Sequence, residues 1–247
     1  MTAVVLQARL DSVRLPGKSL LPLGDKPLIL VVMEALRKLP VDRYILACPD
    51  DCTGFFGPPA EAAGFEMSPG PKDDVLARYC LAIRRFGLHR VIRATGDNPF
   101  VFTDAAAALN AEAGALNADY AGYGGLPLGA GIESVDAGAL IRAEAGAVAA
   151  HEREHVCPYL YGHPELFALH RPLAPRRWQD ASARLTVDTV EDYRRALALD
   201  AALSRLENPG ERYQGEKVIA VYHEIFPSAG VGAAGSVSKT KTTGEEP

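Results

Sequence analysis

Short apolar runs alternate along this chain with stretches whose apolar residues recur every three or four positions. Residues 3–8 and 43–48 are apolar runs that each end in a polar or proline-containing loop, which is typical of buried parallel strands. Residues 90–95 are expected to form another strand, which ends in GDNP. Between these segments, residues 27–39 are expected to form a helix that Pro27 opens and that ends before Pro40. Residues 73–83 have the spacing of an amphipathic helix. This alternation predicts an α/β fold with a mostly parallel, twisted sheet and helices on both faces.

The second half of the chain continues the alternation. A capping-box pattern at residues 189–192 predicts the start of a terminal helix, and Thr103 is the expected N-cap of an earlier, alanine-rich helix. One face of the terminal helix is expected to carry Val190, Tyr193, Leu197 and Ala201. The other expected elements are a strand and a helix within residues 133–146, a helix over 151–162, and strands over 166–170 and 183–187.

The composition limits the class of protein. A chain of 247 residues that is 48% hydrophobic can bury one sizeable core, and we expect a single domain over residues 1–227. Residues 228–247 are small and polar and are expected to form a disordered tail. A formal net charge of -5 argues against a nucleic-acid partner. No apolar stretch is long enough to cross a bilayer, and the opening MTAVVLQAR is too short for a signal peptide, so we expect a cytoplasmic protein without a membrane partner.

The four cysteines form no paired metal-binding motif. Cys48 and Cys52 are spaced to share a metal, but no second pair accompanies them. We therefore expect buried or incidental thiols in a reducing compartment.

The loop after the first strand carries an unusual concentration of positive charge. Residues 9–18, RLDSVRLPGK, hold Arg9, Arg14 and Lys18 together with a proline and a glycine that shape a turn. Ligands of doubly wound folds bind beyond the carboxyl ends of the strands, and three cations beside exposed amides suit a triphosphate. The alternative is a solvated loop whose cations pair with surface carboxylates. Neither a GxxxxGK[ST] loop nor a GxGxxG fingerprint is present.

The segment LQARLDSVRLPGKSLLPLGDKPL closely resembles the opening of the cytidylyltransferases related to CMP-Kdo synthetase, and it is most similar to the spore-coat polysaccharide biosynthesis protein F branch. The shared elements are an apolar strand, the pair AR, a short spacer, SxRLPGK and a second PL. Further similar motifs extend the resemblance over residues 3–200. They are KDDVLARYCLAI at 72–83, IRATGDNPFV at 92–101, GAGIESVDAGAL at 129–140, EREHVCPYLYGHPELF at 152–167 and RLTVDTVEDYRRA at 184–196.

The resemblance implies a fold of the nucleotide-diphospho-sugar transferase (GT-A-like) type and transfer of CMP from CTP to an acidic sugar or a phosphate or phosphonate acceptor. It further implies Mg2+, a homodimer and a role in polysaccharide biosynthesis. The expected catalytic residues are Arg9, Arg14 and Lys18, which would neutralise the β- and γ-phosphates. The expected nucleotide-binding residues are Ala8, Arg9, Ser12, Arg14, Gly17, Lys18, Asp73, Asp74 and Thr95. Asp73 and Asp74 have an equally good explanation as acids at a helix N-terminus.

Two aspartates directly follow predicted strands. Asp97 follows residues 90–95 after one glycine, and Asp188 follows residues 183–187. In a parallel sheet both would emerge at the ligand-bearing edge, where paired carboxylates suit Mg2+, and the resemblance assigns metal coordination to both. The alternative is that each aspartate only caps the segment after it.

The acceptor side is less specific. The resemblance points to Glu133 and His155 as acceptor-binding residues, although the run GIES at residues 131–134 departs from the more acidic run of the branch. Arg176, Arg177 and Trp178 could close over an anionic acceptor or form a surface loop. His151 and His155 also fit HExxH, but Pro158 follows closely and no third zinc ligand is identifiable. The alternative functions are a GT-A glycosyltransferase and a non-catalytic nucleotide-binding protein.

Overall fold

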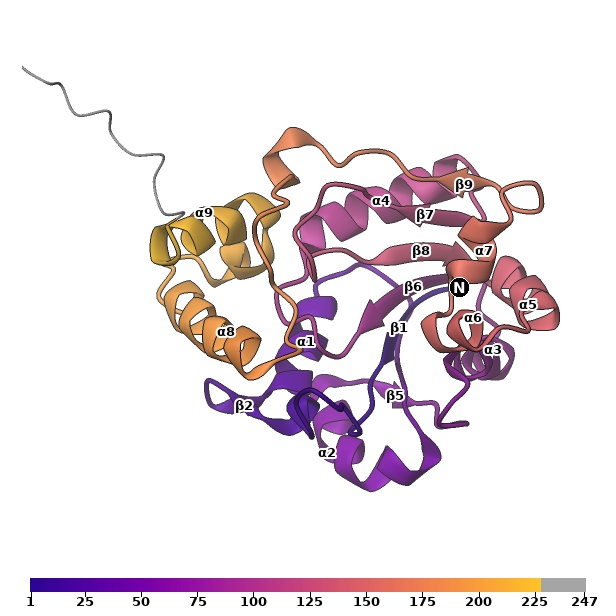
Figure 1. Ribbon diagram of the computed structural model, residues 1–247, viewed down its shortest axis with the longest axis horizontal. Helices are drawn as coiled ribbons and strands as arrows, with labels where there is room; N and C mark the ends of the chain where they lie inside the picture. The colour runs from indigo at the N-terminus through magenta and orange to yellow at the C-terminus, as the bar shows by residue number, and fades with distance from the viewer. Residues whose placement is uncertain (228–247) are drawn as a thin grey trace, which may run out of the picture.

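A seven-stranded sheet runs through the centre of the protein, and the computed structural model describes residues 1–227 of the chain (Figure 1). The expected disordered tail, residues 228–247, lies outside the described residues. The strand order is β5-β4-β1-β6-β8-β7-β9. The strands are β1 (Thr2–Gln7), β4 (Arg43–Ala47), β5 (Glu66–Met67), β6 (Arg90–Thr95), β7 (Tyr120–Gly122), β8 (Glu133–Asp136) and β9 (Leu169–His170), and a separate hairpin joins β2 (Pro22–Leu23) and β3 (Lys26–Pro27).

The sheet is mostly parallel, as predicted. β1 pairs in parallel with β4 and β6, while β8 runs antiparallel to its neighbours β6 and β7. The register places Gln7 beside both Ala47 and Thr95. The carboxyl ends of the three central strands therefore meet at one edge, and the loops after β1 and β6 begin there side by side.

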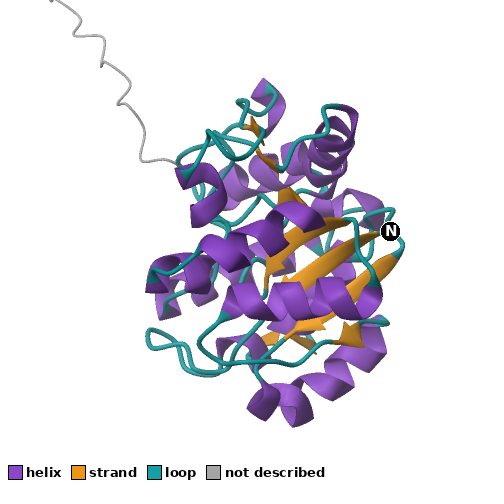
Figure 2. Cartoon of the chain, turned by 90° about the vertical axis from the view of Figure 1, so that its right-hand side faces the viewer, coloured by secondary structure: helices purple, strands orange, loops and turns teal. Residues whose placement is uncertain are grey.

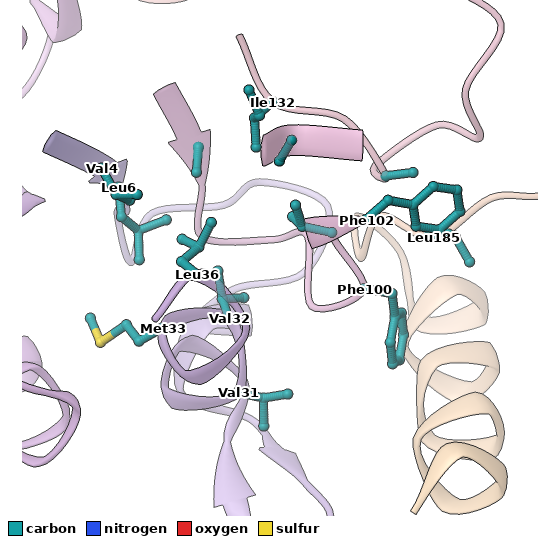
Figure 3. Packing of buried hydrophobic residues seen from close by; sticks show 14 of the residues in the cluster. Val4, Leu6, Val31, Val32, Met33, Leu36, Phe100, Phe102, Ile132 and Leu185 are labelled. Carbon is teal, nitrogen blue, oxygen red and sulfur yellow. The ribbon is translucent and has the colours of Figure 1, made fainter. Parts of the chain in front are cut away.

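Side chains on the two faces of each strand pack into two separate hydrophobic clusters, one on each face of the sheet. Val4 and Leu6 of β1 belong to one cluster, and Ala3 and Val5 belong to the other. Figure 2 shows the strands running between helices, and Figure 3 shows Val4 and Leu6 above the buried side of α1. The first cluster takes apolar residues from α1 (Leu28–Leu36), α2 (Thr53–Ala63), α4 (Thr103–Ala115), α8 (Val190–Leu203) and α9 (Gly215–Ile225), and the second from α3 (Val75–Phe86), α5 (Ala137–Gly146) and α7 (Pro158–Gly162).

For helix α8, the predicted start is confirmed, but the face predicted to be buried is wrong. Thr189 caps α8, and its hydroxyl accepts a hydrogen bond from the Asp192 amide at 3.1 Å. However, Val190 and Leu197 are exposed, because the opposite side of α8 contacts the hydrophobic cluster through Ala196, Leu199 and Leu203. Helix α9, which packs against α8, was not predicted.

Three smaller expectations also need correction. Residues 183–187 form no strand: they are an extended segment with one isolated bridge, from Leu128 to Arg184. Thr103 is the first residue of α4 and not its cap, which is Phe102. The helix expected over residues 151–162 is two short helices, α6 (Ala150–His155) and α7, because Val156 between them adopts a positive φ of 73°.

The cysteines are buried, as expected. Cys48, Cys52, Cys80 and Cys157 are all free thiols, and burial raises the pKa of Cys48 to about 11. Within residues 1–227, no helix has the length and apolar character required to cross a membrane.

Candidate active site

A cavity of about 410 Å³ opens at the carboxyl edge of the central strands. The loop over residues 9–18 forms one wall, and the ends of β1 and β6 form its floor. The opposite wall comes from residues 128–129 and from the extended segment before α8. The site predicted at this edge of the sheet is therefore a real concavity, and it is built from segments far apart in the chain.

Gly17 sets the shape of the first loop. Its φ of 67° is a left-handed conformation that favours glycine, and its amide donates to the Leu10 carbonyl oxygen at 3.0 Å. The Ser12 hydroxyl accepts from the Leu15 amide at 3.4 Å. This folded loop turns the chain inward so that Lys18, the next residue, starts the short 3-10 helix η1 (Lys18–Leu20) with its side chain in the cavity.

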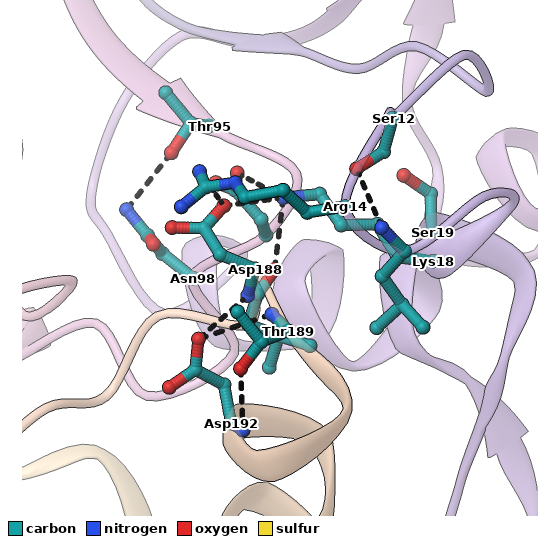
Figure 4. A network of polar contacts seen from close by, with 12 residues as sticks. Ser12, Arg14, Lys18, Ser19, Thr95, Asn98, Asp188, Thr189 and Asp192 are labelled. Atoms are coloured by element: carbon teal, nitrogen blue, oxygen red, sulfur yellow. Dashed lines mark hydrogen bonds and ion pairs between the residues drawn. The ribbon is translucent and has the colours of Figure 1, made fainter.

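Lys18 is the centre of the polar network in the cavity (Figure 4). Only 8% of the residue is exposed. Its Nζ donates to Asp97 Oδ2 at 2.7 Å, to Asp188 Oδ1 at 2.9 Å and to the Val187 carbonyl oxygen at 2.8 Å. Arg14 reaches the same Asp188 oxygen at 3.1 Å. Two cations of the first loop thus contact Asp188, which lies about 170 residues further along the chain.

Asp188 reaches this edge without a strand. The Val187 amide donates to the Asp97 carbonyl oxygen at 2.8 Å, and the Leu185 amide donates to the Leu128 carbonyl oxygen at 2.8 Å. Because these bonds fix the backbone of the extended segment against the end of β6, the two carboxylates face one cation. Thr189, and not Asp188, provides the N-cap of α8, so the capping alternative fails for Asp188.

Gly129 makes the close approach of these two segments possible. A Cβ at this position would lie 2.4 Å from the Thr186 backbone nitrogen, and the φ of Gly129 is +93°. We expect Gly129→Ala to destabilise the protein by about 3 kcal/mol, since the backbone must move and the conformation is strained. Denaturant unfolding would measure this loss. Gly114→Ala is the control, because Gly114 lies in α4 with open space around it and alanine there is expected to be neutral or stabilising. Equal unfolding midpoints for the two variants would contradict this role of Gly129.

The charges of the site stabilise ionised carboxylates. Burial alone would raise the pKa of Asp188, but the hydrogen bond from Lys18 and the charges of Lys18, Arg14 and Arg184 lower it below its usual value. Asp192 lies behind it: burial opposes ionisation, but Arg184 and the Asp188 amide hold the pKa of Asp192 at about 2. Arg184 bonds to both carboxylates, at 3.1 Å to Asp188 and 2.8 Å to Asp192. This second layer fixes the orientation of Asp188.

Several polar residues of the cavity were missed by the sequence analysis. Among the described residues, four buried side-chain atoms have no hydrogen-bond partner: Gln7 Oε1, Arg78 Nε, Arg93 Nε and Asn98 Oδ1. All four residues line this cavity. Buried polar groups are normally paired, so their concentration here marks a place where a polar ligand is expected. All four lie in segments that resemble motifs of the family, LQAR, KDDVLARYCLAI and IRATGDNPFV, and this is the signal that could have found them.

The structure places most of the predicted site residues together. Ala8, Arg9, Ser12, Arg14, Lys18, Thr95, Asp97, His155 and Asp188 all line the cavity. Arg9 lines the cavity, but it also pairs with the half-exposed carboxylates of Asp11 and Glu154, at 3.8 and 3.4 Å. For this residue the alternative of a loop cation paired with surface carboxylates therefore holds in part.

Other predicted residues lie outside the cavity lining. Asp74 is the N-cap of α3, where it accepts from the Ala77 amide at 2.9 Å, and it also pairs with Arg153. Its neighbour Asp73 is exposed. The geometry thus fits the capping explanation of these acids, and not contact with the base or ribose. Gly17 shapes the loop without lining the cavity.

Glu133 belongs to an adjoining second cavity, where it pairs with Arg93. It is therefore not placed beside Asp97 and Asp188. Trp178 is buried and donates to Asp104 at 2.9 Å, and neither it nor Arg176 and Arg177 lines either cavity. The closing role considered for residues 176–178 does not fit this placement. His151 is exposed outside both cavities.

The two aspartates offer a donor set that fits Mg2+. Within the described part of the chain no group of three or more His, Cys, Asp or Glu residues could hold a metal. Mg2+, however, is commonly bound by one or two carboxylates together with water and substrate phosphates. Asp97 and Asp188 already converge on the single cationic Nζ of Lys18, so their oxygens face one position where positive charge is stabilised.

Comparison with known proteins identifies the family. A family model described as "Cytidylyltransferase" matches residues 3–223. The chain belongs to the cytidylyltransferase family. The protein is thus a nucleotidyltransferase, which confirms the resemblance inferred from the motifs and favours nucleotidyl transfer over a glycosyltransferase or a non-catalytic protein.

Related proteins cover most of this cytidylyltransferase. The spore coat polysaccharide biosynthesis protein SpsF of Bacillus subtilis (strain 168) is 33% identical over 202 residues, which are 79% of this chain and 84% of SpsF. A cytidylyltransferase structure from Leptospira borgpetersenii serovar Hardjo-bovis (strain JB197) has a TM-score of 0.81 at 22% identity and covers 91% of this chain and 94% of its own. A CMP:2-keto-3-deoxy-manno-octonic acid synthetase solved with CTP has a TM-score of 0.63 at 16% identity, and the match covers 81% of this chain and 98% of the synthetase chain. These likenesses confirm the nucleotide-diphospho-sugar transferase fold.

Proposed function

We propose that this cytidylyltransferase transfers CMP from CTP, with Mg2+, to an acidic sugar or a phosphate or phosphonate acceptor. The observation that carries the proposal is the convergence of Lys18, Arg14 and two carboxylates in one cavity at the carboxyl edge of the sheet. A triphosphate with its metal requires this combination of cations and oxygen donors.

The names of related proteins support CTP as the donor and a sugar acid as one acceptor class. One structural neighbour was solved with CTP. A 3-deoxy-manno-octulosonate cytidylyltransferase of Pseudomonas fluorescens (strain SBW25) is 33% identical over 103 residues, which are 40% of this chain. SpsF is named for polysaccharide biosynthesis, and we place this protein in the same kind of pathway. The homodimer and the cytoplasmic location stay predictions.

In the proposed reaction an acceptor oxygen attacks the α-phosphorus of CTP. The bond from this phosphorus to the bridging oxygen breaks, and that oxygen leaves with its electron pair as part of pyrophosphate. Arg14 and Lys18, which line the cavity, would offset the charge of the β- and γ-phosphates as it increases on the leaving group. Because phosphoryl transfer needs little covalent help from the protein, positioning and electrostatics account for most of the catalysis.

Asp97 and Asp188 are the residues that would hold Mg2+. When bound, the metal supplies Lewis-acid polarisation of the phosphoryl oxygens. Arg184 and the backbone of Val187 keep the two carboxylates in place during the reaction. If the acceptor is a carboxylate, phosphate or phosphonate, its oxygen is already ionised near neutral pH, so this chain needs no strong general base.

Pyrophosphate release tests the proposal. CTP, UTP, ATP and GTP would each be incubated with Mg2+ and a panel of sugar acids, phosphates and phosphonates. We expect acceptor-dependent release with CTP and little with the other nucleotides. Absence of release with every acceptor, together with no CTP binding by calorimetry, would refute the function.

A further inference from the structure

A second cavity of about 660 Å³ adjoins the first. The two share part of their lining, which consists of Arg93, Thr95, Asn98, Leu128 and Gly129. Lys18, Asp97 and Asp188 line only the first cavity. A molecule in the second cavity would therefore lie next to the proposed nucleotide site without occupying the positions of the two aspartates.

The walls of the second cavity are mostly neutral. They include Tyr120, Tyr123 and the glycine-rich segment over residues 122–129, together with Gly131. Backbone amides and carbonyls in such a wall suit the hydroxyl groups of a polyhydroxylated ligand. The tyrosine hydroxyls are already engaged, since Tyr120 donates to Glu133 at 2.7 Å and Tyr123 donates to Glu112.

Three charged side chains line this cavity: Arg93, Glu133 and Arg171. Arg93 and Glu133 form an ion pair with each other, and both are largely buried. Their charges offset one another. Arg171, by contrast, forms no ion pair or side-chain hydrogen bond with any residue in the described range 1–227. The second cavity therefore has one uncompensated positive charge.

Local structure holds Arg171 at the cavity. It directly follows β9, which pairs in parallel with β7, and the next residues are fixed by the Gly124 amide, which donates to the Pro172 carbonyl oxygen at 2.9 Å. The guanidinium carbon lies 5.3 Å from the ring centroid of Tyr161. The Tyr161 ring in turn lies 5.8 Å from that of Tyr120 in the cavity wall. An arginine stacked on an aromatic ring keeps its donors free for a carboxylate or phosphate.

We propose that the second cavity holds the acceptor and that Arg171 binds an anionic group of that acceptor, a carboxylate, phosphate or phosphonate. This inference rests on the proposed cytidylyl transfer. It assigns recognition of the acceptor charge to a residue that does not line the proposed nucleotide site. Arg171 is thus a specificity residue. Its loss is expected to lower the affinity for the acceptor and to leave the affinity for the nucleotide unchanged.

Binding measurements test this assignment without turnover. The protein would be saturated with Mg2+ and the α,β-methylene analogue of CTP, which cannot transfer CMP. Three anionic probes would then be titrated calorimetrically: 3-deoxy-manno-octulosonate, glycerol 3-phosphate and 2-hydroxyethylphosphonate. The variants are Arg171→Gln and Arg171→Lys. The matched control is Arg177→Gln. Arg171 and Arg177 are both exposed arginines that stack on an aromatic ring, but Arg177, 4.2 Å from the Trp178 ring centroid, lines neither cavity.

We expect at least one probe to bind the wild-type protein and Arg171→Gln to weaken it about 10- to 100-fold, the usual value of a hydrogen bond to a charged group. Arg171→Lys should lower probe affinity less than Arg171→Gln does, because lysine keeps the positive charge but lacks the paired donors of the guanidinium. Arg177→Gln should change probe affinity less than about twofold, and no variant should change affinity for the CTP analogue.

Three results would overturn the assignment. They are equal probe affinity in the wild type and Arg171→Gln, no probe binding to the analogue-saturated wild type, and a parallel loss of analogue affinity in Arg171→Gln. Failure of the wild type to bind the CTP analogue would instead refute the proposed function, and the inference with it. Normal analogue binding with unchanged probe affinity would refute the role of Arg171 alone.

Discussion

Replacing either Asp97 or Asp188 with asparagine is expected to lower CMP transfer about 1,000-fold. Each substitution keeps the size of the side chain and removes one negative charge from the pair that faces Lys18. A bound metal contributes several kcal/mol of transition-state stabilisation, and each 1.4 kcal/mol corresponds to a tenfold change in rate. Pyrophosphate release at saturating CTP, over a range of Mg2+ concentrations, measures the effect.

The control for these variants is Asp25→Asn. Asp25 is an exposed aspartate in the turn of the β2–β3 hairpin, outside the cavity lining, and its loss should leave the rate unchanged. Binding of Mn2+, followed by electron paramagnetic resonance, gives a readout that does not depend on turnover. Rates within tenfold of the wild type for both variants, with unchanged Mn2+ affinity, would exclude these carboxylates as metal ligands.

Replacing Lys18 with methionine is expected to lower the transfer rate about 100- to 1,000-fold, as for the loss of one donor that stabilises charge in a transition state. Methionine retains the apolar stem of the buried side chain but lacks the ammonium group that contacts both aspartates. The exposed Lys38, in the turn after α1, provides the matched control Lys38→Met.

The same substitution should change the response of stability to metal. Without the ammonium group, Asp97 and Asp188 face each other with less compensating charge, so the folded state of Lys18→Met should be less stable than the wild type. Mg2+ should therefore raise the thermal unfolding temperature of Lys18→Met more than that of the wild type or of Lys38→Met. An equal response in all three proteins would show that Lys18 does not occupy a cation position between the aspartates.

The sequence alone determined the elements whose signals are local. Residues 90–95 are β6 as predicted, because their apolar residues Val91, Ile92 and Ala94 are all buried in the sheet. The spacing of Val75, Leu76, Tyr79, Cys80 and Ile83 identified the buried face of α3, and Thr189 identified the start of α8. The cations of the first loop were found for the same reason: they lie within ten residues of one another, directly after a strand.

Tertiary structure decided which face of α8 is buried and how Asp188 reaches the site. Val190 and Leu197 form an apolar face in sequence, yet the packing partners of α8 lie on its other side. The segment before Asp188 resembles a strand, but its amides bond to Leu128 and Asp97 outside the sheet. Contacts of this kind join residues about 60 to 90 positions apart, and no local periodicity encodes them.

The second cavity depended on tertiary structure throughout. Arg93 and Glu133 compensate each other only because β6 and β8 are neighbours in the sheet, with these two residues in register. Arg171 reaches the same cavity because the short strand β9 pairs with β7. In sequence, Arg171 is one of many arginines, and Arg176 and Arg177 beside a tryptophan looked more suitable. A charge becomes available to a ligand when folding leaves it without a partner, and that depends on every neighbour that the fold brings to it.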